Sequence, residues 1–323
     1  MNDLGRSRPA GILVGFLADA LLGDPRRGHP VAGFGWCATG LEARTYRDSR
    51  AAGVMHTAVL VGGVIGAAAV TQHRVRHRWV GAALTAAATW VALGGTTLAR
   101  TGSEMADLLD AGDLDAARDL LPSLCGRDPS VLDSQGLARA ACESVAENTS
   151  DAQVAALFWA ALAGVPGVLA YRAINTLDAM IGNFSARYAR FGWAAARLDD
   201  LANYVPARLT GALVLVCAPL AGGSPARAAR AWRRDAARHP SPNAGIPEAA
   251  FAGALGVRLG GPTQYRYRLE IRPALGDGPA PGATELRRAV RLSRLVQASA
   301  LAAALVISAV GHRSDGQRRR PPR

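Results

Sequence analysis

Hydrophobic positions along the chain gather into runs of helical length and do not alternate with polar ones. The two clearest runs are Met55–Thr71 and Trp79–Ala99, separated by the basic turn Arg74–Arg78. About 20 apolar residues cross the hydrocarbon core of a bilayer, so this pair predicts two membrane spans joined as a hairpin. A shorter run, Leu295–Val310, is a further candidate span, and Ala10–Leu22 is shorter still.

Two other apolar runs are less regular. Val154–Ile174 contains Gly164–Gly167 with a proline at its middle, which predicts two short helices, re-entrant or buried, instead of one straight span. Leu209–Leu220 is too short to span without tilt, and length favours buried core helices for both runs. We therefore predict an all-α, polytopic helical membrane protein with polar loops and re-entrant or buried short helices.

The pattern predicts one integral-membrane domain over residues 1–312, followed by a disordered basic tail at 313–323. The formal net charge is +12, and the basic residues are essentially all arginine. Their runs alternate with apolar segments, which favours membrane flanks and contact with lipid over a nucleic-acid surface. No aromatic and basic residues interleave, so we expect no nucleic-acid partner.

The first polar block that can carry chemistry is GDPRRGHP, Gly23–Pro30. Asp24 and His29 lie in this proline-bounded loop directly after an apolar helix. A carboxylate and an imidazole at a membrane edge can bind a metal ion or move a proton. The alternative is structural, because glycine followed by proline also ends a helix without any further role.

The second block predicts a helix that begins near Ser134 and presents one charged stripe. Arg139, Glu143, Glu147 and Asp151 recur every four residues, and therefore share a face. Carboxylates on one face can hold Mg²⁺, which prefers oxygen ligands. The alternative is a solvent-facing stripe with an Arg–Glu pair, but three acids with one base repel each other at this spacing.

The third block follows an apolar run and is dense in acidic, amide and arginine side chains. Its candidates are Arg172, Asn175, Asp178, Asp199, Asp200, Asn203 and Arg208, and Pro206 is expected to end the local helix. Adjacent aspartates point to different sides of a helix, whereas residues four apart share a face. Arginines beside apolar segments either pair with acids or hold phosphate through two donors. A buried structural ion-pair network remains the alternative.

The fourth block, His239–Gly261, begins with a proline-rich turn that contains Ser241 and Asn243. Glu248 opens a helix directly after Pro247. A helix start supplies free N–H groups and can bind an anion. A well-capped helix with no ligand explains the same residues, because early proline and glutamate are ordinary start signals.

Five stretches, taken in order, resemble the CobD/CbiB family. They cover residues 23–261 and read GDPRRGHPVAGFGW, GRDPSVLD with ACESVAENTSDA, YRAINTLDAMIG, FGWAAARLDDLANYVPARLTG and SPNAGIPEAAFAGALGVRLGG. One such motif is a weak signal, and five in the family's order are highly specific. The family usually has serine where this chain has Ala179, so a hydroxyl ligand there is missing or was never essential.

The resemblance implies an integral inner-membrane enzyme of late adenosylcobalamin synthesis. Its reaction joins adenosylcobyric acid to (R)-1-aminopropan-2-ol phosphate, or to aminopropanol, through an amide bond, with ATP and Mg²⁺. It further implies corrinoid and aminopropanol phosphate as substrates, and it suggests other late cobalamin-pathway membrane enzymes as partners. Use of ATP places the site on the cytoplasmic side.

Amide formation needs the carboxylate oxygen to become a leaving group, as in an acyl phosphate formed from ATP. We hypothesise that Glu143, Glu147 and Asp151 hold Mg²⁺. Binding of phosphate groups is assigned to arginines and their polar neighbours: Arg127, Arg172, Asn175, Asp178, Asn203, Arg208, Ser241 and Asn243. The candidates that deprotonate the amine or otherwise take part in catalysis are Asp24, His29, Asp199 and Asp200.

Two other classes of protein fit part of the pattern. Apolar segments with buried polar residues also describe a transporter, but a transporter is expected to show repeated halves, and the sequence has none. A membrane signalling protein of the AmpE type is the third class, and the density of acids and arginines in four blocks argues against it. If all four blocks form one site, the turn Arg74–Arg78 faces outward, against the positive-inside tendency.

Overall fold

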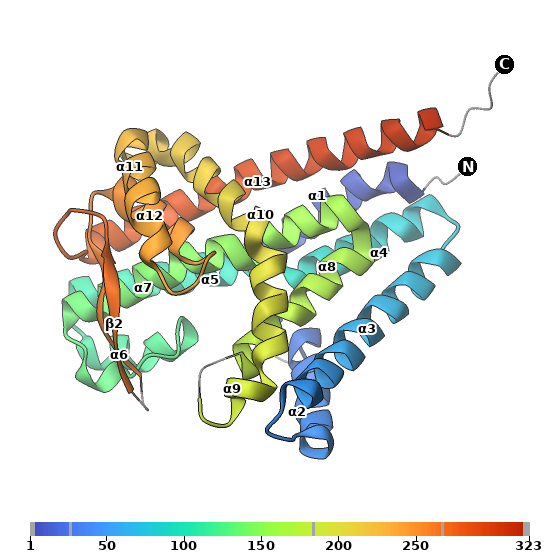
Figure 1. Ribbon diagram of the computed structural model, residues 1–323. Coiled ribbons are helices and arrows are strands. Elements are labelled where there is room, and N and C mark those ends of the chain that lie inside the picture. The colour runs from blue at the N-terminus through green and yellow to red at the C-terminus, as the bar shows by residue number, and fades with distance from the viewer. Residues whose placement is uncertain (1–3, 26–27, 183–184, 266–267, 319–323) are drawn as a thin grey trace. The chain divides into compact units, whose positions relative to one another are not determined.

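The protein is an all-α polytopic membrane protein with one small two-stranded sheet (Figure 1). The computed structural model describes residues 4–25, 28–182, 185–265 and 268–318. Its contacts divide the chain into two compact units. Unit 1 comprises residues 1–94, 155–203 and 300–323, and unit 2 comprises 95–154 and 204–299. Three of the four divisions fall inside helical segments, where no linker in the sequence marks them.

Unit 1 is built from long helices. In chain order they are α1 (Leu4–Leu22), α2 (Pro30–Thr45), α3 (Arg50–Arg74), α4 (Arg78–Ala92), α8 (Ala156–Ile181), the short α9 (Tyr188–Phe191), the first part of α10 (Trp193–Cys217) and the last part of α13 (Ala283–Arg318). Helix α13 continues to Arg318, into the range of the predicted tail, and residues 319–323 lie outside the described residues.

Unit 2 mixes helices with irregular chain. It contains α5 (Gly95–Ala111), α6 (Leu114–Leu120), α7 (Ser134–Thr149), α11 (Pro225–Asp235) and α12 (Gly245–Leu255), together with the rest of α10 and α13. A π-helical segment, Ser150–Ala155, follows α7. The strands β1 (Leu259–Tyr265) and β2 (Arg268–Leu275) pair antiparallel, with a register shift between Leu259 and Gly261. The helix expected after Pro247 in the fourth block is present as α12.

Five helical segments among the described residues are long and apolar enough to cross a membrane. They are Arg50–Arg74, Arg78–Ala111, Ser134–Ile181, Trp193–Ala221 and Ala283–Val310. The predicted hairpin of spans is confirmed in these terms, although its second run is interrupted where α4 ends at Ala92 and α5 begins at Gly95. Two runs that looked like short buried helices belong to longer apolar segments, because flanking residues continue the same helices.

The break predicted at Gly164 is present inside α8. Gly164 has φ +64° and ψ −147°, a conformation that side chains with a Cβ avoid. Arg8 of α1 donates to the carbonyl oxygens of Ala161 (3.1 Å) and Leu162 (3.4 Å), and Gln72 of α3 accepts from the Val165 N–H at 3.3 Å. The neighbouring helices thus satisfy the backbone groups that the break releases, as membrane helices require.

Pro206 does not end its helix, which corrects the sequence prediction. Helix α10 runs through it to Cys217. A proline inside a helix frees the carbonyl four residues earlier, here that of Ala202. The indole N–H of Trp159 donates to this oxygen at 3.1 Å. The tertiary hydrogen bond replaces the lost helical one, so the helix continues.

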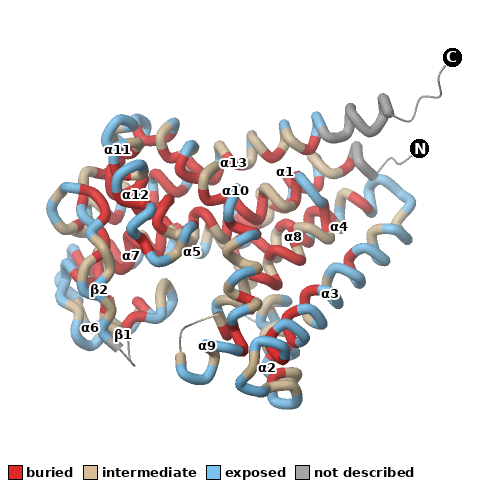
Figure 2. The backbone as a smooth tube through the Cα atoms, viewed as in Figure 1, coloured by how far each residue is buried: buried red, intermediate tan, exposed pale blue. Residues whose placement is uncertain are grey.

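Small residues bring helices of unit 1 close together. Gly11 and Gly15 of α1, four residues apart, lie against α4, and a Cβ on either would come within 2.7 Å of Thr85 or Thr89. This is the small-residue packing by which membrane helices approach each other. Much of α3, in contrast, is exposed along its length, including Val59 (55%) and Ile65 (42%), as the pale blue stretches of Figure 2 show. An exposed apolar face suits contact with lipid tails.

Candidate functional site

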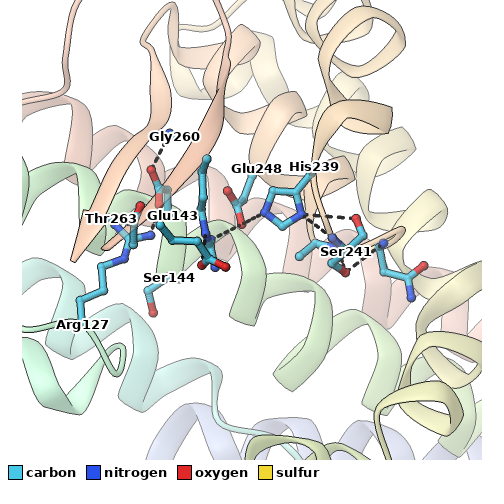
Figure 3. Close-up of polar contacts among 12 residues, drawn as sticks. Arg127, Glu143, Ser144, His239, Ser241, Glu248, Gly260 and Thr263 are labelled. Atoms are coloured by element: carbon cyan, nitrogen blue, oxygen red, sulfur yellow. Dashed lines mark hydrogen bonds and ion pairs between the residues drawn. The ribbon is translucent and has the colours of Figure 1, made fainter. Parts of the chain in front are cut away.

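A buried group of charged side chains lies in unit 2, where α7, α12 and the β1–β2 hairpin meet a loop after α6 (Figure 3). Helix α7 begins as predicted, with Asp133 as its N-cap, whose side chain accepts from the Gly136 N–H at 2.7 Å. This start places Glu143 on the buried side of the helix, where it is 2% exposed. Arg127, 7% exposed, comes from the turn before the short 3₁₀ helix Pro129–Val131.

Arg127 and Glu143 form a buried ion pair. The Arg127 guanidinium donates to Glu143 Oε2, and the backbone N–H of Gly260 donates to Oε1 at 2.7 Å. Gly260 adopts φ +79°, and a Cβ there would lie 2.0 Å from the Pro273 carbonyl oxygen. Burial alone would lower the pKa of Arg127, but the charge of Glu143 outweighs it and raises the pKa, so the arginine stays charged. The pair anchors the hairpin onto α7.

Glu248, in the first turn of α12, is 1% exposed, and neither of its carboxylate oxygens has a hydrogen-bond partner. His239 Nε2 lies 3.6 Å from Oε1, and Arg272 of β2 lies 3.9 Å from the same atom. Both distances exceed that of a hydrogen bond. Burial raises the pKa of Glu248 well above its usual range, and the charges of Glu143 and Glu147 raise it further against the opposite effect of Arg272 and Arg127.

His239 is a neutral imidazole at physiological pH. Burial, reinforced by the charge of Arg272, lowers its pKa to about 4. Its Nδ1 lies 3.1 Å from the Ser241 N–H and 3.3 Å from the Ser241 carbonyl oxygen. We assign the ring proton to Nε2, the tautomer in which Nδ1 accepts the shorter of the two bonds. Nε2 has no hydrogen-bond partner and faces Glu248. Nε2 of the histidine is therefore an N–H donor beside the Glu248 carboxylate, at a distance too long for a hydrogen bond.

The loop between α11 and α12 also gathers three predicted phosphate ligands. Arg208 donates to Asn243 Oδ1 at 3.2 Å and lies 3.5 Å from the centre of the Tyr204 ring. Ser241 Oγ accepts from the N–H groups of Asn243 (3.2 Å) and Ala244 (3.1 Å). Sequence spacing does not reveal this group, because Arg208 lies more than 30 residues from the loop.

Unit 1 holds a second polar group, which spans α8 and α10. Tyr171 donates to Asn203 Oδ1 at 2.9 Å, and Asn203 Nδ2 donates to Asp199 Oδ2 at 3.0 Å. Asn175 Nδ2 contacts Asp199 Oδ1 at 3.4 Å, and Arg172 contacts Asn175 Oδ1 at 3.5 Å. Arg172 Nε is buried without a hydrogen-bond partner. The group is a continuous relay from a tyrosine to an arginine.

Known proteins match this chain over almost its whole length. The family model described as CobD/Cbib protein matches residues 12–293. The chain is 63% identical to a cobalamin biosynthesis protein CobD from Mycobacterium bovis, over 94% of this chain and 97% of the relative. CobD proteins from Geobacter metallireducens and Rhodobacter capsulatus are 45% and 42% identical, over 87% and 89% of this chain and 91% and 93% of the relatives. No solved structure gives a significant match.

The chain belongs to the CobD/CbiB family.

The resemblance seen in five motifs is thereby confirmed, and the chain is a cobalamin biosynthesis protein of this family. Two of the motifs converge in unit 2, where the second supplies Arg127 and Glu143 and the fifth supplies Glu248. The third and part of the fourth supply the polar group of unit 1. The family's polar blocks thus form two distinct groups of contacts, and each can be judged by its own hydrogen bonds.

The predicted magnesium ligands Glu143, Glu147 and Asp151 are not brought together. Within the described residues, no group of three or more acidic, histidine or cysteine side chains is placed to hold a metal ion. Glu143 already accepts from Arg127 and Gly260. The α-helical repeat ends at Thr149, and the π-helical segment that contains Asp151 changes the spacing. The three-carboxylate ligand set stays a prediction, and the contacts of Glu143 do not favour it.

The four predicted catalytic residues do not form one group. Asp199 lies in the relay of unit 1, whereas Asp200 pairs with Arg197 at 3.0 Å, so the two neighbours face different partners as expected. Asp24 lies 3.7 Å from His29 Nε2. His29 Nδ1 accepts from the Val31 N–H and caps α2, so its structural role as a helix boundary is present. Asp178 lies near the end of α8, where its backbone carbonyl accepts from the Gly182 N–H at 2.7 Å.

Sequence reasoning left Glu248, His239, Arg272 and Tyr171 out of the site. From the sequence, Glu248 is interpreted as an ordinary helix-start residue, which would be exposed. In the structure every residue of α12, including Glu248, is buried. A carboxylate in a short helix that is otherwise apolar on all sides, GIPEAAFAGAL, is the signal that finds it. Arg272 offered no such signal, because only the hairpin brings it beside Glu248.

Proposed function

We propose that this chain catalyses amide formation between adenosylcobyric acid and (R)-1-aminopropan-2-ol phosphate, or free aminopropanol, driven by ATP. The observation that carries the proposal is the buried charged group of unit 2 in a chain that belongs to the CobD/CbiB family. A carboxylate does not acylate an amine at neutral pH, so the corrinoid propionate must first become an acyl phosphate. The product is adenosylcobinamide phosphate or, from the free alcohol, adenosylcobinamide.

The residues fit the polar substrates better than they fit a resident metal ion. Magnesium is therefore proposed as part of the Mg-ATP substrate, where phosphate oxygens and water supply most of its ligands. When bound, it neutralises charge on the transferred phosphoryl group. Arg208 and the Ser241–Asn243 loop are proposed to bind phosphate, because the guanidinium is fixed by Tyr204 and Asn243 while the loop presents polar groups beside it.

Arg127 is not assigned to phosphate, because its guanidinium is engaged by buried Glu143. Its role in the proposed reaction is to hold the hairpin and to fix the charge balance around Glu248. Arg172 in unit 1 remains a proposed anion ligand. Its buried Nε lacks a partner, and its contact with Asn175 is long at 3.5 Å.

We further propose that the protein resides in the cytoplasmic membrane with its site toward the cytoplasm, where ATP is available. Other late cobalamin-pathway membrane enzymes are proposed neighbours that receive the product. Topology can be tested with single cysteines introduced at Arg76 and at Arg118, labelled in intact cells and in inverted vesicles. Labelling of the residue-118 position from the outside contradicts the proposed orientation of unit 2.

The reaction itself is tested with the full chain in lipid nanodiscs. The protein is given adenosylcobyric acid, aminopropanol phosphate and Mg-ATP, and the corrinoid products are analysed by mass spectrometry. Formation of adenosylcobinamide phosphate that requires ATP and the amine is the expected result. Arg208→Ala is expected to raise the KM for the phosphorylated amine or ATP at least tenfold, whereas Arg230→Ala, on the basic helix α11, serves as the matched control. Absence of the amide with all substrates present contradicts the proposal.

A further inference from the structure

The carboxylate of Glu248 has the properties of a receptor for a positively charged ligand. Buried carboxylates are normally hydrogen-bonded, since an unpaired charge in the interior is costly. Here both oxygens lack partners although the side chain is 1% exposed. Nearby donors are present but stop short, with His239 at 3.6 Å and Arg272 at 3.9 Å from Oε1. The site is therefore built around acceptor atoms that remain available.

The charged side chains around Glu248 determine the net charge of a ligand that Glu248 can bind. The group contains three carboxyl side chains, Glu143, Glu147 and Glu248, and two guanidiniums, Arg127 and Arg272, of which Glu147 and Arg272 are only half-buried. His239 contributes no charge, because its pKa is lowered to about 4. At the edge of the group, Glu270 is 3.8 Å from Arg272, and Arg139 donates to the Pro262 carbonyl oxygen at 2.8 Å. Counted together, these two side chains add one negative and one positive charge. When Glu248 is ionised, the group carries three negative and two positive charges, so one bound positive charge completes the balance.

The requirement for one positive charge favours a primary ammonium over a divalent metal ion. A divalent ion would leave this group with excess positive charge, and among the described residues no three acidic, histidine or cysteine side chains are placed to hold a metal ion. A primary ammonium carries one charge and three N–H donors, and it can use both free oxygens of Glu248. Nε2 of His239, which carries the ring proton, lies 3.6 Å from Glu248 Oε1. An N–H donor at this position disfavours a second donor at Oε1, but it can donate to a phosphate or hydroxyl oxygen of the ligand.

We propose that Glu248 binds the ammonium group of the aminopropanol substrate and accepts one of its protons. The inference rests on the proposed function, whose amine substrate it assigns to a named residue. One N–H bond breaks and one O–H bond forms on the Glu248 carboxylate, which leaves a neutral amine. The nitrogen lone pair then forms the C–N bond as the C–O bond of the acyl phosphate breaks. The departing phosphate takes the second proton from nitrogen, which leaves a neutral amide and hydrogen phosphate.

The electrostatic environment agrees with this role. A base that must take a proton from an ammonium works best when its own affinity for protons is raised toward that of the amine. Burial and the charges of Glu143 and Glu147 raise the pKa of Glu248 in this direction. Arg272 and Arg127 oppose the shift, and so limit how strongly the proton is retained. The geometry of available acceptor atoms and the charge count carry the proposal.

Binding of the amine is measured apart from the reaction. The full-length protein in nanodiscs is titrated calorimetrically with (R)-1-aminopropan-2-ol phosphate, without ATP or Mg²⁺, and with isopropyl phosphate, which lacks the amine. The wild-type protein is expected to bind the amine at least tenfold more tightly than the analogue. Glu248→Gln is expected to abolish that preference while leaving the weak binding of isopropyl phosphate unchanged.

Glu104→Gln is the matched control, because it makes the same substitution in unit 2 at an exposed position of α5. Equal binding of the amine and the analogue by wild-type protein overturns the inference even if the variant does not fold. A Glu248-dependent heat with Mg²⁺ alone also overturns it. Amide formation that persists in Glu248→Gln at the wild-type rate refutes this inference and leaves the proposed function intact, whereas no amide from wild type refutes the function itself.

Discussion

The two polar groups differ in how their hydrogen bonds are completed. In unit 1, Tyr171, Asn203 and Asp199 bond to one another, so each satisfies its neighbour. In unit 2, Glu248 is equally buried, but its oxygens find donors only beyond hydrogen-bond distance. A satisfied network fixes the geometry of its helices, whereas an unsatisfied carboxylate is tolerated only where a ligand or proton completes it. Similar residue types thus serve different purposes.

The largest effect is expected where a buried charge loses its partner. Arg127→Met leaves Glu143 charged and unpaired, which should destabilise the protein by about 3–5 kcal/mol. Thermal unfolding in nanodiscs measures the loss. Arg190→Met is the control, because Arg190 and its partner Asp48 are 66% and 59% exposed and such pairs contribute about 0–1 kcal/mol. Equal effects of the two substitutions would show that the pair is not the anchor of the hairpin.

The relay of unit 1 should respond less strongly but clearly. Asn203→Leu removes one buried hydrogen bond from Tyr171 and one from Asp199, which should cost about 1–3 kcal/mol in stability. Asp200→Asn is the comparison, because that aspartate pairs with Arg197 at a partly exposed site. Unfolding temperatures of the two variants test the difference. If Asn203→Leu leaves the protein as stable as wild type, the relay does not hold α8 to α10.

Glu248 is expected to affect stability with the opposite sign. Its carboxyl has a raised pKa in the folded protein and a value near about 4.3 when unfolded. As the pH rises above the unfolded value, the unfolded chain ionises first, so the wild type loses stability until the folded pKa is reached. Glu248→Gln lacks this loss and should become the more stable protein as the pH is raised from 5 to 8.

His239 cancels from that comparison because both proteins contain it. By itself it works in the other direction, since its folded pKa of about 4 lies below the unfolded value near 6.5. Its contribution to stability therefore grows as the pH rises through this interval. Unfolding of wild type and Glu248→Gln at several pH values is the measurement. A difference that is constant with pH would contradict the raised pKa of Glu248.

The smallest effect is expected at Pro206, where structure compensates a local defect. Trp159→Phe removes the donor to the Ala202 carbonyl and should cost about 1 kcal/mol in stability. In a Pro206→Ala background the helical N–H replaces that donor, so the same substitution should cost less. A double-mutant cycle on unfolding temperature gives the coupling. Additive losses would show that the indole does not compensate the proline.

Residue order alone was enough to predict the helical membrane class, the break at Gly164, the start of α7 and the family. These depend on local properties: the length of apolar runs, the conformational freedom of glycine and the capping of a helix by Asp133. The five motifs in their order also identify the family, because together they compare many positions of the chain with the family pattern. The shared side of Asp199 and Asn203 also follows from helical spacing alone.

Which charges meet could be learned only from the folded chain. Glu143 was expected beside Asp151 on one stripe, but Arg127 and Gly260 occupy its oxygens and a π-helical segment shifts Asp151. Glu248 meets His239 and Arg272 because a helix and a hairpin, separate in sequence, pack together. Helical periodicity specifies the direction of a side chain within its own element. The partner it finds depends on contacts between elements, and these also determine whether a buried carboxylate is satisfied or left to receive a ligand.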